Sequence, residues 1–425
     1  MQVVFLNGPI SFEEGIVECQ SRGIQPIIVA ESRFASRLDV VEGVSTFFLD
    51  RLDLNGVVNL LEENECDNIL NVYAFSDQDV LLSVLLNQHY GISTVVNDQS
   101  IVSYQSKMNL RNTLSGNIHL APYEVLSLDQ VSSFLDDNKS DGNFILKPAV
   151  GYSSLGVAKV DEGFSLSSYL DKMPDVFSKL AQDCVIKDSD LFSQIQNQTI
   201  LAESFIEGQE AAVDLVVING EIHFSQVCSK APMKEPWFEE IMYLVPGDFS
   251  VEASSALFEA SKKIVDLLQV KTSIMHIEFI IDASDTPFFI DLGFRMGGRG
   301  LSSRLCSVST GNSLFGMYLD GLLNKGISKS LVIRERSLLY LQQVKEGGIV
   351  SALPMMDKSV SADFSVHCVE DASFIQPDQV LSGYPDHSGL PGYFLFSLPK
   401  TVPMSDVNRF VHFCYENLNP EYKGN

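Results

Sequence analysis

The chain has 425 residues, too many for one ordinary hydrophobic core, so two or three packed units are expected. Hydrophobic residues make up 45% of it and charged residues 20%, values that are typical of a folded globular protein and exclude a largely disordered chain. The 55 acidic residues outnumber the 29 basic ones and give a net charge of −26, so we expect neither nucleic acid nor an anionic membrane as a partner.

The first hundred residues alternate short apolar runs with amphipathic stretches. This pattern predicts three strands, at residues 3–6, 26–29 and 69–73, and two helices, at residues 12–22 and 77–89. Ser76 is placed to cap the second helix. A β-α-β order of this kind implies a small parallel sheet covered by helices. Because the region contains no GxGxxG sequence, we predict no dinucleotide site there.

From about residue 100 onward, apolar strands flank glycine-bearing turns, which is an antiparallel signature. Three segments show it: FILKPAVGYSSLGVAKV, TILAESFIEGQEAAVDLVVING and IMHIEFIIDASDTPFFIDL. A helical segment is predicted at about residues 165–195, and a final helix near residues 407–418.

Lys147 lies in the first of these segments, within a strand of apolar neighbours. A lysine in such a place is rarely buried without a partner. The glycine-bearing loop at residues 151–156 follows at once, but it is not a P-loop, because the lysine precedes the glycines. A strand, a glycine-rich turn and a strand can fold over a triphosphate as a flap. A plain hairpin turn is the alternative.

The second segment places a loop between Glu203, near the end of one strand, and Glu210, near the start of the next. Such a loop can offer backbone groups to an adenine edge and an acidic side chain to ribose hydroxyls. The alternative is an ordinary solvated loop.

The third segment is a hairpin whose register can be worked out from its turn at residues 282–287. Pairing outward sets Ile281 opposite Phe288, Phe279 opposite Ile290, and Glu278 opposite Asp291. His276, Glu278 and Ile280 then share one face with Asp291. Opposed residues have Cβ atoms roughly 5 Å apart, where like charges are destabilising unless a cation lies between them. Oxygen ligands of this kind suit magnesium. The alternative to a metal site is two carboxylates exposed to solvent, because a bulge would change the register and Glu278 would no longer lie opposite Asp291.

Arg295 follows the hairpin and lies beside Gly297 and Gly298. Backbone N–H groups and a forked guanidinium suit phosphate or carboxylate oxygens. By itself a Gly-Gly pair is usually a turn, but after a metal-binding hairpin it indicates an anion site.

Together and in this order, the segments resemble the ATP-grasp superfamily over nearly the whole chain. The resemblance implies an α/β and α+β protein with the ATP-grasp fold. It would have an N-terminal parallel α/β domain at residues 1–100, a central lid and nucleotide-binding subdomain at 101–220, and a C-terminal mixed-sheet domain at 221–425 with the metal and substrate site.

Among ATP-grasp proteins, the chain is most similar to bacterial L-amino-acid ligases, which make dipeptides. Residues 236–246, PWFEEIMYLVP, resemble that family's P-(aromatic)-F-x-E-x-x-(H/Y)-x-x-P substrate segment. Residues 387–393, HSGLPGY, resemble its C-terminal turn.

The resemblance implies the following nucleotide site: Lys107 and Lys147 on the α- and β-phosphates, Ser153 and Ser154 in the flap, Glu203 facing the adenine amino group, backbone of Phe205 or Ile206 on the ring, and Glu210 on ribose. It implies the following metal and substrate site: Glu278 and Asp291 holding Mg²⁺, Arg295 on the γ-phosphate and acyl oxygens, Gly297 and Gly298 with the substrate, and Glu240 and Tyr243 in the amino-acid pocket. Arg295 and Lys147 are the expected catalytic residues, and the expected cofactors are ATP and Mg²⁺, for which Mn²⁺ can substitute.

The chain departs from the superfamily in one place. Many ATP-grasp enzymes carry E-x-N where this chain has Asp291, Leu292 and Gly293, so an amide ligand to the metal is missing. Some amino-acid ligases resemble this chain in carrying glycine there, so the departure concerns the number of metal ions more than catalysis. Aspartate in place of glutamate also shortens the reach by one methylene.

The implied reaction joins a carboxylate to an amine. The carboxylate takes the γ-phosphoryl group of ATP, an amine attacks the resulting acylphosphate, and closure of the flap at about residues 149–156 keeps water away. Two alternatives stay open: a ligase that uses an amine other than an amino acid, and a nucleotide-binding regulatory protein without catalysis. The presence of Lys147, Glu210, Glu278, Asp291 and Arg295 together speaks against the second.

The cellular setting is expected to be the cytoplasm. The seven cysteines are scattered, odd in number and contain no CxxC pair, which suits a reducing compartment better than a disulfide framework or a zinc site. The start of the sequence has no basic leader, and no apolar stretch approaches the roughly 20 residues of a membrane helix. The expected partners are amino acids and ATP, with a homodimer left open.

Overall fold

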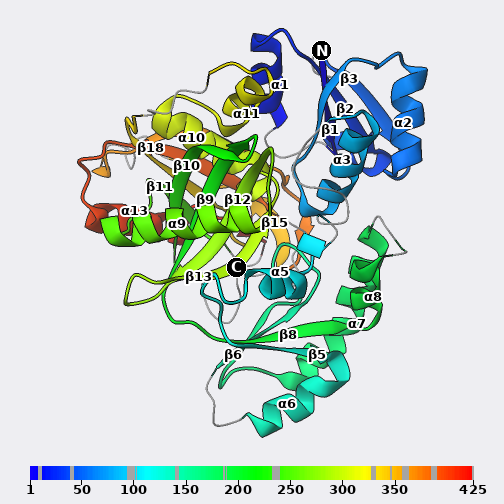
Figure 1. Cartoon of the computed structure of the whole chain (residues 1–425). Coiled ribbons are helices and arrows are strands. Elements are labelled where there is room, and N and C mark those ends of the chain that lie inside the picture. The colour runs from blue at the N-terminus through cyan, green and yellow to red at the C-terminus, as the bar shows by residue number, and fades with distance from the viewer. Residues whose placement is uncertain are drawn as a thin grey trace.

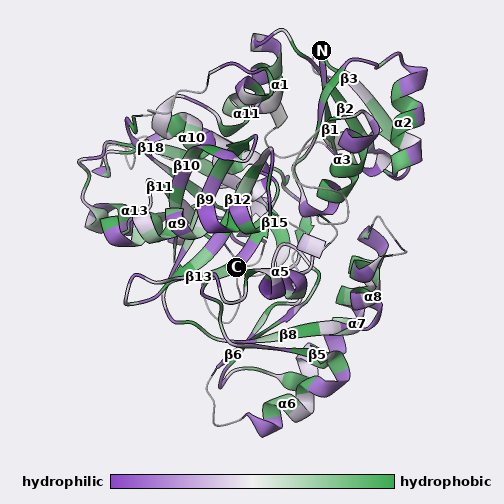
Figure 2. Cartoon of the chain, in the orientation of Figure 1, coloured by the Kyte–Doolittle hydropathy of each residue, from purple (hydrophilic) through white to green (hydrophobic). Residues whose placement is uncertain are grey.

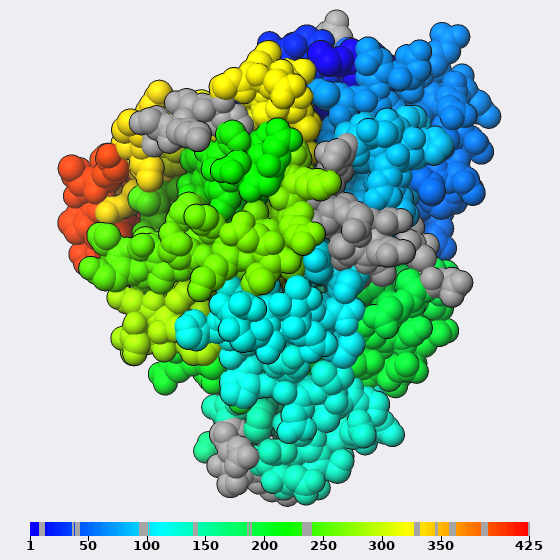
Figure 3. Space-filling model, in the orientation of Figure 1, coloured from blue at the N-terminus to red at the C-terminus, as the bar shows by residue number. Residues whose placement is uncertain are grey.

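A computed structural model gives the structure. It describes residues 1–7, 12–38, 43–92, 101, 103–138, 143–184, 187, 189–231, 240–326, 332–344, 347–356, 363–383 and 390–423. Figure 1 shows a blue N-terminal part, a cyan-to-green part at the opposite end of the molecule, and a large sheet in the middle. In the space-filling view these parts are in close contact (Figure 3).

The N-terminal part is a four-stranded parallel sheet in the order β3-β2-β1-β4. Its strands are β1 (Gln2–Leu6), β2 (Gln25–Glu31), β3 (Ser45–Leu49) and β4 (Ile69–Ala74). Its helices are α1 (Phe12–Ser21), α2 (Leu54–Glu63) and α3 (Asp77–His89). The predicted parallel sheet is confirmed. The sequence patterns missed β3 and α2, and β3 is an only partly buried edge strand with weak alternation.

The part predicted as the lid holds a four-stranded antiparallel sheet in the order β5-β8-β6-β7. Its strands are β5 (Tyr123–Ser127), β6 (Phe144–Pro148), β7 (Ala158–Val160) and β8 (Thr199–Ser204). The helices in this part are α5 (Lys107–Leu114), α6 (Val131–Asp137), α7 (Leu166–Asp183) and α8 (Asp190–Gln196). Helix α7 buries Tyr169, Met173, Phe177 and Leu180, which recur at helical spacing and so form the face that packs on the lid sheet.

The largest sheet has eight antiparallel strands in the order β13-β12-β9-β10-β11-β14-β18-β16. The strands are β9 (Gln209–Ile218), β10 (Glu221–Lys230), β11 (Met242–Val245), β12 (Ser273–Ile281), β13 (Pro287–Gly293), β14 (Arg336–Leu341), β16 (His367–Ser373) and β18 (Gly392–Leu398). A small sheet, β17-β15-β19, combines β15 (Gly348–Ala352), β17 (Val380–Leu381) and β19 (Glu421–Tyr422).

Helices cover both faces of this sheet. They are α9 (Val251–Leu267), α10 (Leu301–Thr310), α11 (Leu314–Leu322) and α13 (Met404–Asn417). Because both faces are covered, β9 and β12 are almost wholly buried and are apolar along most of their length (Figure 2). Among the described residues, no helix is both long enough and apolar enough to cross a membrane.

Helix α11 also joins the N-terminal domain to the large sheet. Phe315 packs in one cluster with Phe5 and Tyr73 of the parallel sheet, with ring centroids 5.5 Å and 5.0 Å away. The two domains therefore share a hydrophobic core and are not merely tethered.

Candidate active site

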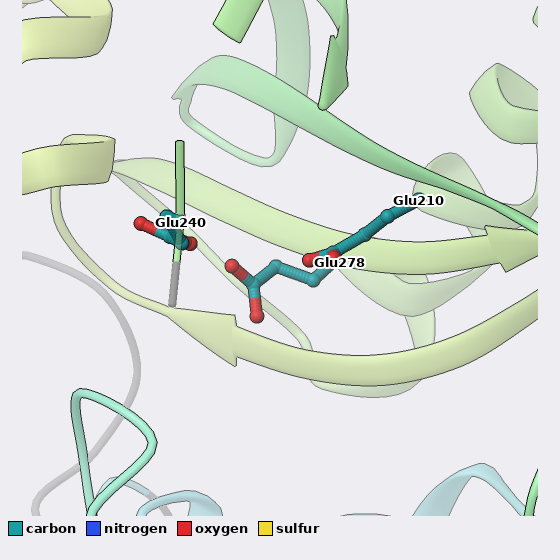
Figure 4. A group of neighbouring side chains, drawn as sticks. All are labelled: Glu210, Glu240 and Glu278. Carbon is teal, nitrogen blue, oxygen red and sulfur yellow. The ribbon is translucent and has the colours of Figure 1, made fainter. Parts of the chain in front are cut away.

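Three carboxylates and one ammonium group meet where β9, β10, β11 and β12 lie side by side. Lys230 ends β10, and its Nζ lies 2.6 Å from Glu210 Oε1, 2.8 Å from Glu240 Oε1 and 2.7 Å from Glu278 Oε1. The three glutamates each offer an oxygen within 4.8 Å of the others (Figure 4). The structure thus brings together three residues that the sequence assigned to ribose, substrate and metal.

The electrostatics of this cluster follow from burial and close charges. Burial alone would lower the pKa of Lys230, but the three carboxylates raise it well above its ordinary value. Burial raises the pKa of Glu210, and Lys230 only partly offsets that. The pKa of Glu278 falls well below its ordinary value because Lys230 and His276 outweigh its burial. Carboxylate oxygens are the donors that a hard divalent cation takes, so Glu278 fits a magnesium ligand, while in this structure all three acids are paired with Lys230.

Behind Glu278 lies a buried pair that sequence reasoning did not assign. His276 Nδ1 lies 2.8 Å from Asp214 Oδ1, and its Nε2 lies 3.5 Å from Glu278 Oε1. Burial opposes the charge on His276, yet Asp214 and Glu278 raise its pKa to about 9. The imidazolium ring therefore orients Glu278, in the way that second-layer partners fix metal-ligating side chains. The signal in the sequence is a histidine two residues before the glutamate, on the same strand face.

The β12–β13 hairpin confirms one predicted pair and corrects two. Glu278 lies opposite Asp291, as predicted, but Phe279 pairs with Phe289 and Ile281 with Pro287, so the predicted partners Ile290 and Phe288 are wrong. The turn is one residue shorter than expected, and a bulge after Glu278 restores the register. The carbonyl of Ile290, in this bulge, accepts a hydrogen bond from Arg111 Nη2 at 2.8 Å.

Asp291 is paired with Lys107 rather than included in the three-glutamate cluster. Lys107 Nζ also lies 3.3 Å from the Gly151 carbonyl, and its backbone N–H donates to the Ala149 carbonyl at 2.7 Å. Lys107 therefore joins the hairpin to the base of the flap.

Lys147 and Glu203 face each other across β6 and β8. Lys147 Nζ lies 2.5 Å from Glu203 Oε2, and Arg111 Nε binds the other oxygen. Burial and the nearby Arg111 lower the pKa of Lys147 to about 8, against the attraction of Glu203. The same two cations lower the pKa of Glu203 despite its burial. Glu203 thus lies in a buried ion-pair network, and its predicted contact with adenine remains a prediction.

The flap and hinge residues lie where the sequence placed them in the chain. Ser153 and Ser154 form the turn between β6 and β7, with φ of 49° and 53°, a backbone conformation uncommon for residues other than glycine. Phe205 lies in the hinge after β8, with the Lys159 ammonium 4.3 Å from its ring centroid. Ile206 follows in the same hinge, which ends where β9 begins.

The loop after β13 holds Arg295, Gly297 and Gly298. Arg295 binds Asp77 of helix α3 through Nε, 2.9 Å from Oδ1, and through Nη2. A Cβ atom at Gly297 would lie 2.5 Å from the His276 ring, so only glycine fits there. Gly298 has a φ of 55°, which glycine adopts without strain.

Tyr243 is buried behind the cluster, and the Lys230 ammonium lies 5.3 Å from its ring centroid. Burial and the adjacent Glu240 raise the pKa of Tyr243 well above its ordinary value. The aromatic part of the predicted pocket, Trp237 and Phe238, lies outside the described residues, as does the start of the predicted turn at 387–389.

Besides the Asp214–His276 pair, three further charged residues of this site were not predicted from the sequence: Arg111, Lys230 and Asp77. A sequence feature could have pointed to Arg111, since it lies four residues after Lys107 on the same helix face. A weaker feature marks Lys230, a lysine that ends a ten-residue strand. No feature marks Asp77 beyond its place in the first turn of α3.

Comparisons with known proteins agree with this architecture. Residues 140–303 match the family model described as ATP-grasp domain. The L-amino acid ligase from Bacillus licheniformis superimposes with a TM-score of 0.79 at 20% identity, over 100% of this chain and 99% of that one. Phosphoribosylglycinamide synthetase from Anaerococcus prevotii gives 0.66 at 13% identity, over 99% of both chains.

A third similar structure is the biotin carboxylase domain of 2-oxoglutarate carboxylase from Hydrogenobacter thermophilus, in complex with MgADP, ADP and bicarbonate. It gives a TM-score of 0.69 at 13% identity, over 99% of this chain and 91% of that one. The search of curated proteins returned no match. The chain has the ATP-grasp fold. Residues 140–303, which hold most of the site described above, form an ATP-grasp domain.

Proposed function

We propose that this protein is an ATP-dependent carboxylate–amine ligase that joins two amino acids by a peptide bond, with ADP and phosphate as the other products. The observation that carries the proposal is the gathering of Lys107, Lys147, Lys230 and Arg295, each in contact with a carboxylate, in a protein of net charge −26. Buried cations on such an acidic chain indicate an anionic ligand, and a nucleoside triphosphate fits the ATP-grasp domain.

The four cations have different proposed roles, which follow from their positions. Lys107 and Lys147, at the base of the flap, bind the α- and β-phosphates, and each exchanges its carboxylate partner for a phosphate oxygen. Arg295 and Lys230 lie nearer Glu278 and stabilise the charge that develops as the γ-phosphoryl group passes to the substrate carboxylate. The acylphosphate so formed is then attacked by an amine, and inorganic phosphate leaves.

Magnesium would be held by Glu278 and Asp291, which the register sets opposite each other, and would neutralise phosphate charge when bound. Asp214 and His276 orient Glu278 for this role. The closed flap excludes water, so that the acylphosphate meets the amine and not a hydroxide.

Glu240 is the group proposed to receive the substrate ammonium. Its side chain is 35% exposed, against 12% for Glu210 and 22% for Glu278, so it is the most accessible acid of the cluster. An ammonium beside a partly desolvated carboxylate gains more from the pairing than it would in water.

The test is phosphate release from ATP and Mg²⁺ across a matrix of paired amino acids, with mass spectrometry of the products. The proposal expects phosphate only when amino acids are present and a peptide mass in equal amount. Phosphate release with one amino acid and a different amine would favour a ligase that uses an amine other than an amino acid. No phosphate release with any pair would contradict the proposal that the protein is a ligase.

A substitution then locates the amino-acid pocket. Glu240→Gln should raise the KM for one amino acid by about tenfold or more, which corresponds to a lost charge-assisted hydrogen bond, and leave the KM for ATP nearly unchanged. Glu252→Gln, at an exposed position on α9, is the control. Equal effects on ATP and amino acid would place the pocket elsewhere.

A further inference from the structure

All the site residues predicted from the sequence lie after the N-terminal domain, yet that domain reaches into the site. Asp77, in the first turn of α3, accepts from both Nε and Nη2 of Arg295, a residue 218 positions further along the chain. We propose that Asp77 is the positioning residue of Arg295: it fixes the guanidinium at the anion site, an inference that rests on the proposed function.

The donors of Arg295 show what this contact leaves available. A guanidinium has five N–H groups. Asp77 takes one on Nε and one on Nη2, and the Met296 carbonyl takes one on Nη1 at 2.9 Å. Among the described residues no hydrogen bond engages the other two, one on each terminal nitrogen. Asp77 thus holds the Nε and Nη2 edge of the guanidinium, and one N–H on each terminal nitrogen is left to meet an oxyanion.

A second contact from the N-terminal domain reaches the same loop. The Met296 N–H donates to the Tyr73 hydroxyl at 3.1 Å, and Tyr73 is in β4, the strand that precedes α3. The Arg295 side chain and the Met296 main chain are therefore both held by residues of the N-terminal domain. A side chain fixed before the reaction avoids an ordering cost in the transition state.

The pairing depends on a glycine. A Cβ atom at Gly293 would lie 2.9 Å from Asp77 Oδ1 and 3.3 Å from Cγ and Cζ of Arg295. The backbone of Gly293 is not in the left-handed region, so a larger residue is opposed there by space and not by conformation, and the Asp77 carboxylate would have to shift. The missing side chain at position 293 is thus what admits the Asp77 carboxylate.

The chain offers a matched control for the loss of a pair between domains. Arg22, just after α1, forms the same two-point contact with Asp320 of α11, at 2.8 Å for both bonds, and its Nη1 also contacts the Glu18 carboxylate. The side chains of Arg22 and Asp320 are 16% and 29% exposed, against 17% and 30% for Arg295 and Asp77. This pair is not among the contacts of the site.

The first experiment compares Asp77→Asn with Asp320→Asn. Both should lower the melting temperature, because each removes one charge of a partly buried pair. Only Asp77→Asn should lower kcat, by about tenfold or more, with the KM for ATP within about twofold of wild type, because a contact used in the transition state is lost. A merely structural Asp77 would give the same kcat as Asp320→Asn, and that result would overturn the inference.

The second experiment is a double-mutant cycle. Gly293→Ala should lower kcat by pushing Asp77 off Arg295, and adding it to Asp77→Ala should cost little more, since the contact is already gone. Fully additive losses would show that position 293 acts by another route and would overturn the steric argument. The conservative Asp77→Asn variant keeps the volume of the side chain, so the test does not depend on an alanine being tolerated.

The outcomes also separate this inference from the function on which it rests. A folded wild-type protein that releases no phosphate with any amino-acid pair overturns both. An active wild-type protein whose kcat is unchanged by Asp77→Asn overturns the positioning role alone.

Discussion

At the scale of single residues, the candidate site is a set of cations and carboxylates that pair with one another. Lys107 pairs with Asp291, Lys147 with Glu203, and Lys230 with three glutamates. Breaking a buried pair by removing one partner is costly. Under the proposed function, Lys107 and Lys147 would keep an anionic partner by exchanging these carboxylates for the phosphates of the nucleotide.

Lys147 gives a pH dependence whose sign can be worked out. Its pKa is about 8 in the free protein, and a bound triphosphate would raise it, so binding takes up a proton above that pH. We expect ATP affinity to fall by up to about tenfold per pH unit as pH rises beyond about 8. Calorimetric titration from pH 7 to pH 9.5 measures this.

The control is Lys147→Met, which should bind ATP more weakly at neutral pH and show no break near pH 8. If the variant keeps the wild-type affinity, the ammonium does not lie in the nucleotide site.

Glu278 gives the prediction for the metal. Glu278→Gln keeps the shape of the side chain but removes the charge shared with Lys230 and His276. We expect phosphate release to fall by at least about a hundredfold at low Mg²⁺, and excess Mg²⁺ to recover part of it, because a charged oxygen ligand is lost. Near-normal turnover at low Mg²⁺ would contradict the assignment, and ADP binding measured with and without Mg²⁺ gives a readout that does not depend on turnover.

At the scale of elements, the local patterns were predictable and the contacts between distant elements were not. The Lys147 strand, the flap and the Glu278–Asp291 pair follow from alternation and turn chemistry over a few residues. The bulge at Ile290 could not be predicted from the hairpin sequence, because the Ile290 carbonyl that it frees binds Arg111, which lies in a different element. Lys230 and Asp77 were not predicted for the same reason: the partners of Lys230 lie on other strands, and the partner of Asp77 lies in another domain.

The flap provides an element-scale prediction through Gly156. Its φ is +75°, and a Cβ atom would lie 3.0 Å from Pro148 Cγ, 3.1 Å from Val176 Cγ1 and 3.2 Å from Met173 Cε. Gly156→Ala should therefore destabilise the lid by roughly 1–3 kcal/mol. Gly116→Ala is the control, since Gly116 has a φ of +76° and open space around it.

The difference between the two glycine variants in denaturant unfolding isolates the packing of the flap on α7. If the flap keeps water from the acylphosphate, Gly156→Ala should also release more phosphate per peptide formed than Gly116→Ala does. Equal stability and equal phosphate-to-peptide ratios in the two variants would mean that the flap does not pack as described.

At the scale of the whole molecule, the N-terminal domain shares a core with the large sheet and also contacts the candidate site. Phe315 of α11 lies against Phe5 and Tyr73, and Tyr73 and Asp77 hold the segment that carries Arg295. The N-terminal domain thus contacts both the shared core and the segment that carries the guanidinium.

Phe315→Ala tests this coupling. Removing a fully buried phenylalanine should cost roughly 3–5 kcal/mol, and here the loss falls on the surface between the two domains. Phe396→Ala, in β18, removes an equally buried ring from a cluster that contains no N-terminal residue, so it should cost a similar amount without disturbing the docking.

At a temperature where both variants remain folded, we expect Phe315→Ala to lower kcat as Asp77→Asn does and Phe396→Ala to leave it near wild type. Denaturant unfolding checks the stability, and phosphate release checks kcat. If the two variants lose stability and activity in the same proportion, the N-terminal domain contributes only to stability. A selective loss in Phe315→Ala would instead mean that the parallel sheet, which carries no predicted site residue, sets the geometry of the reaction through Arg295.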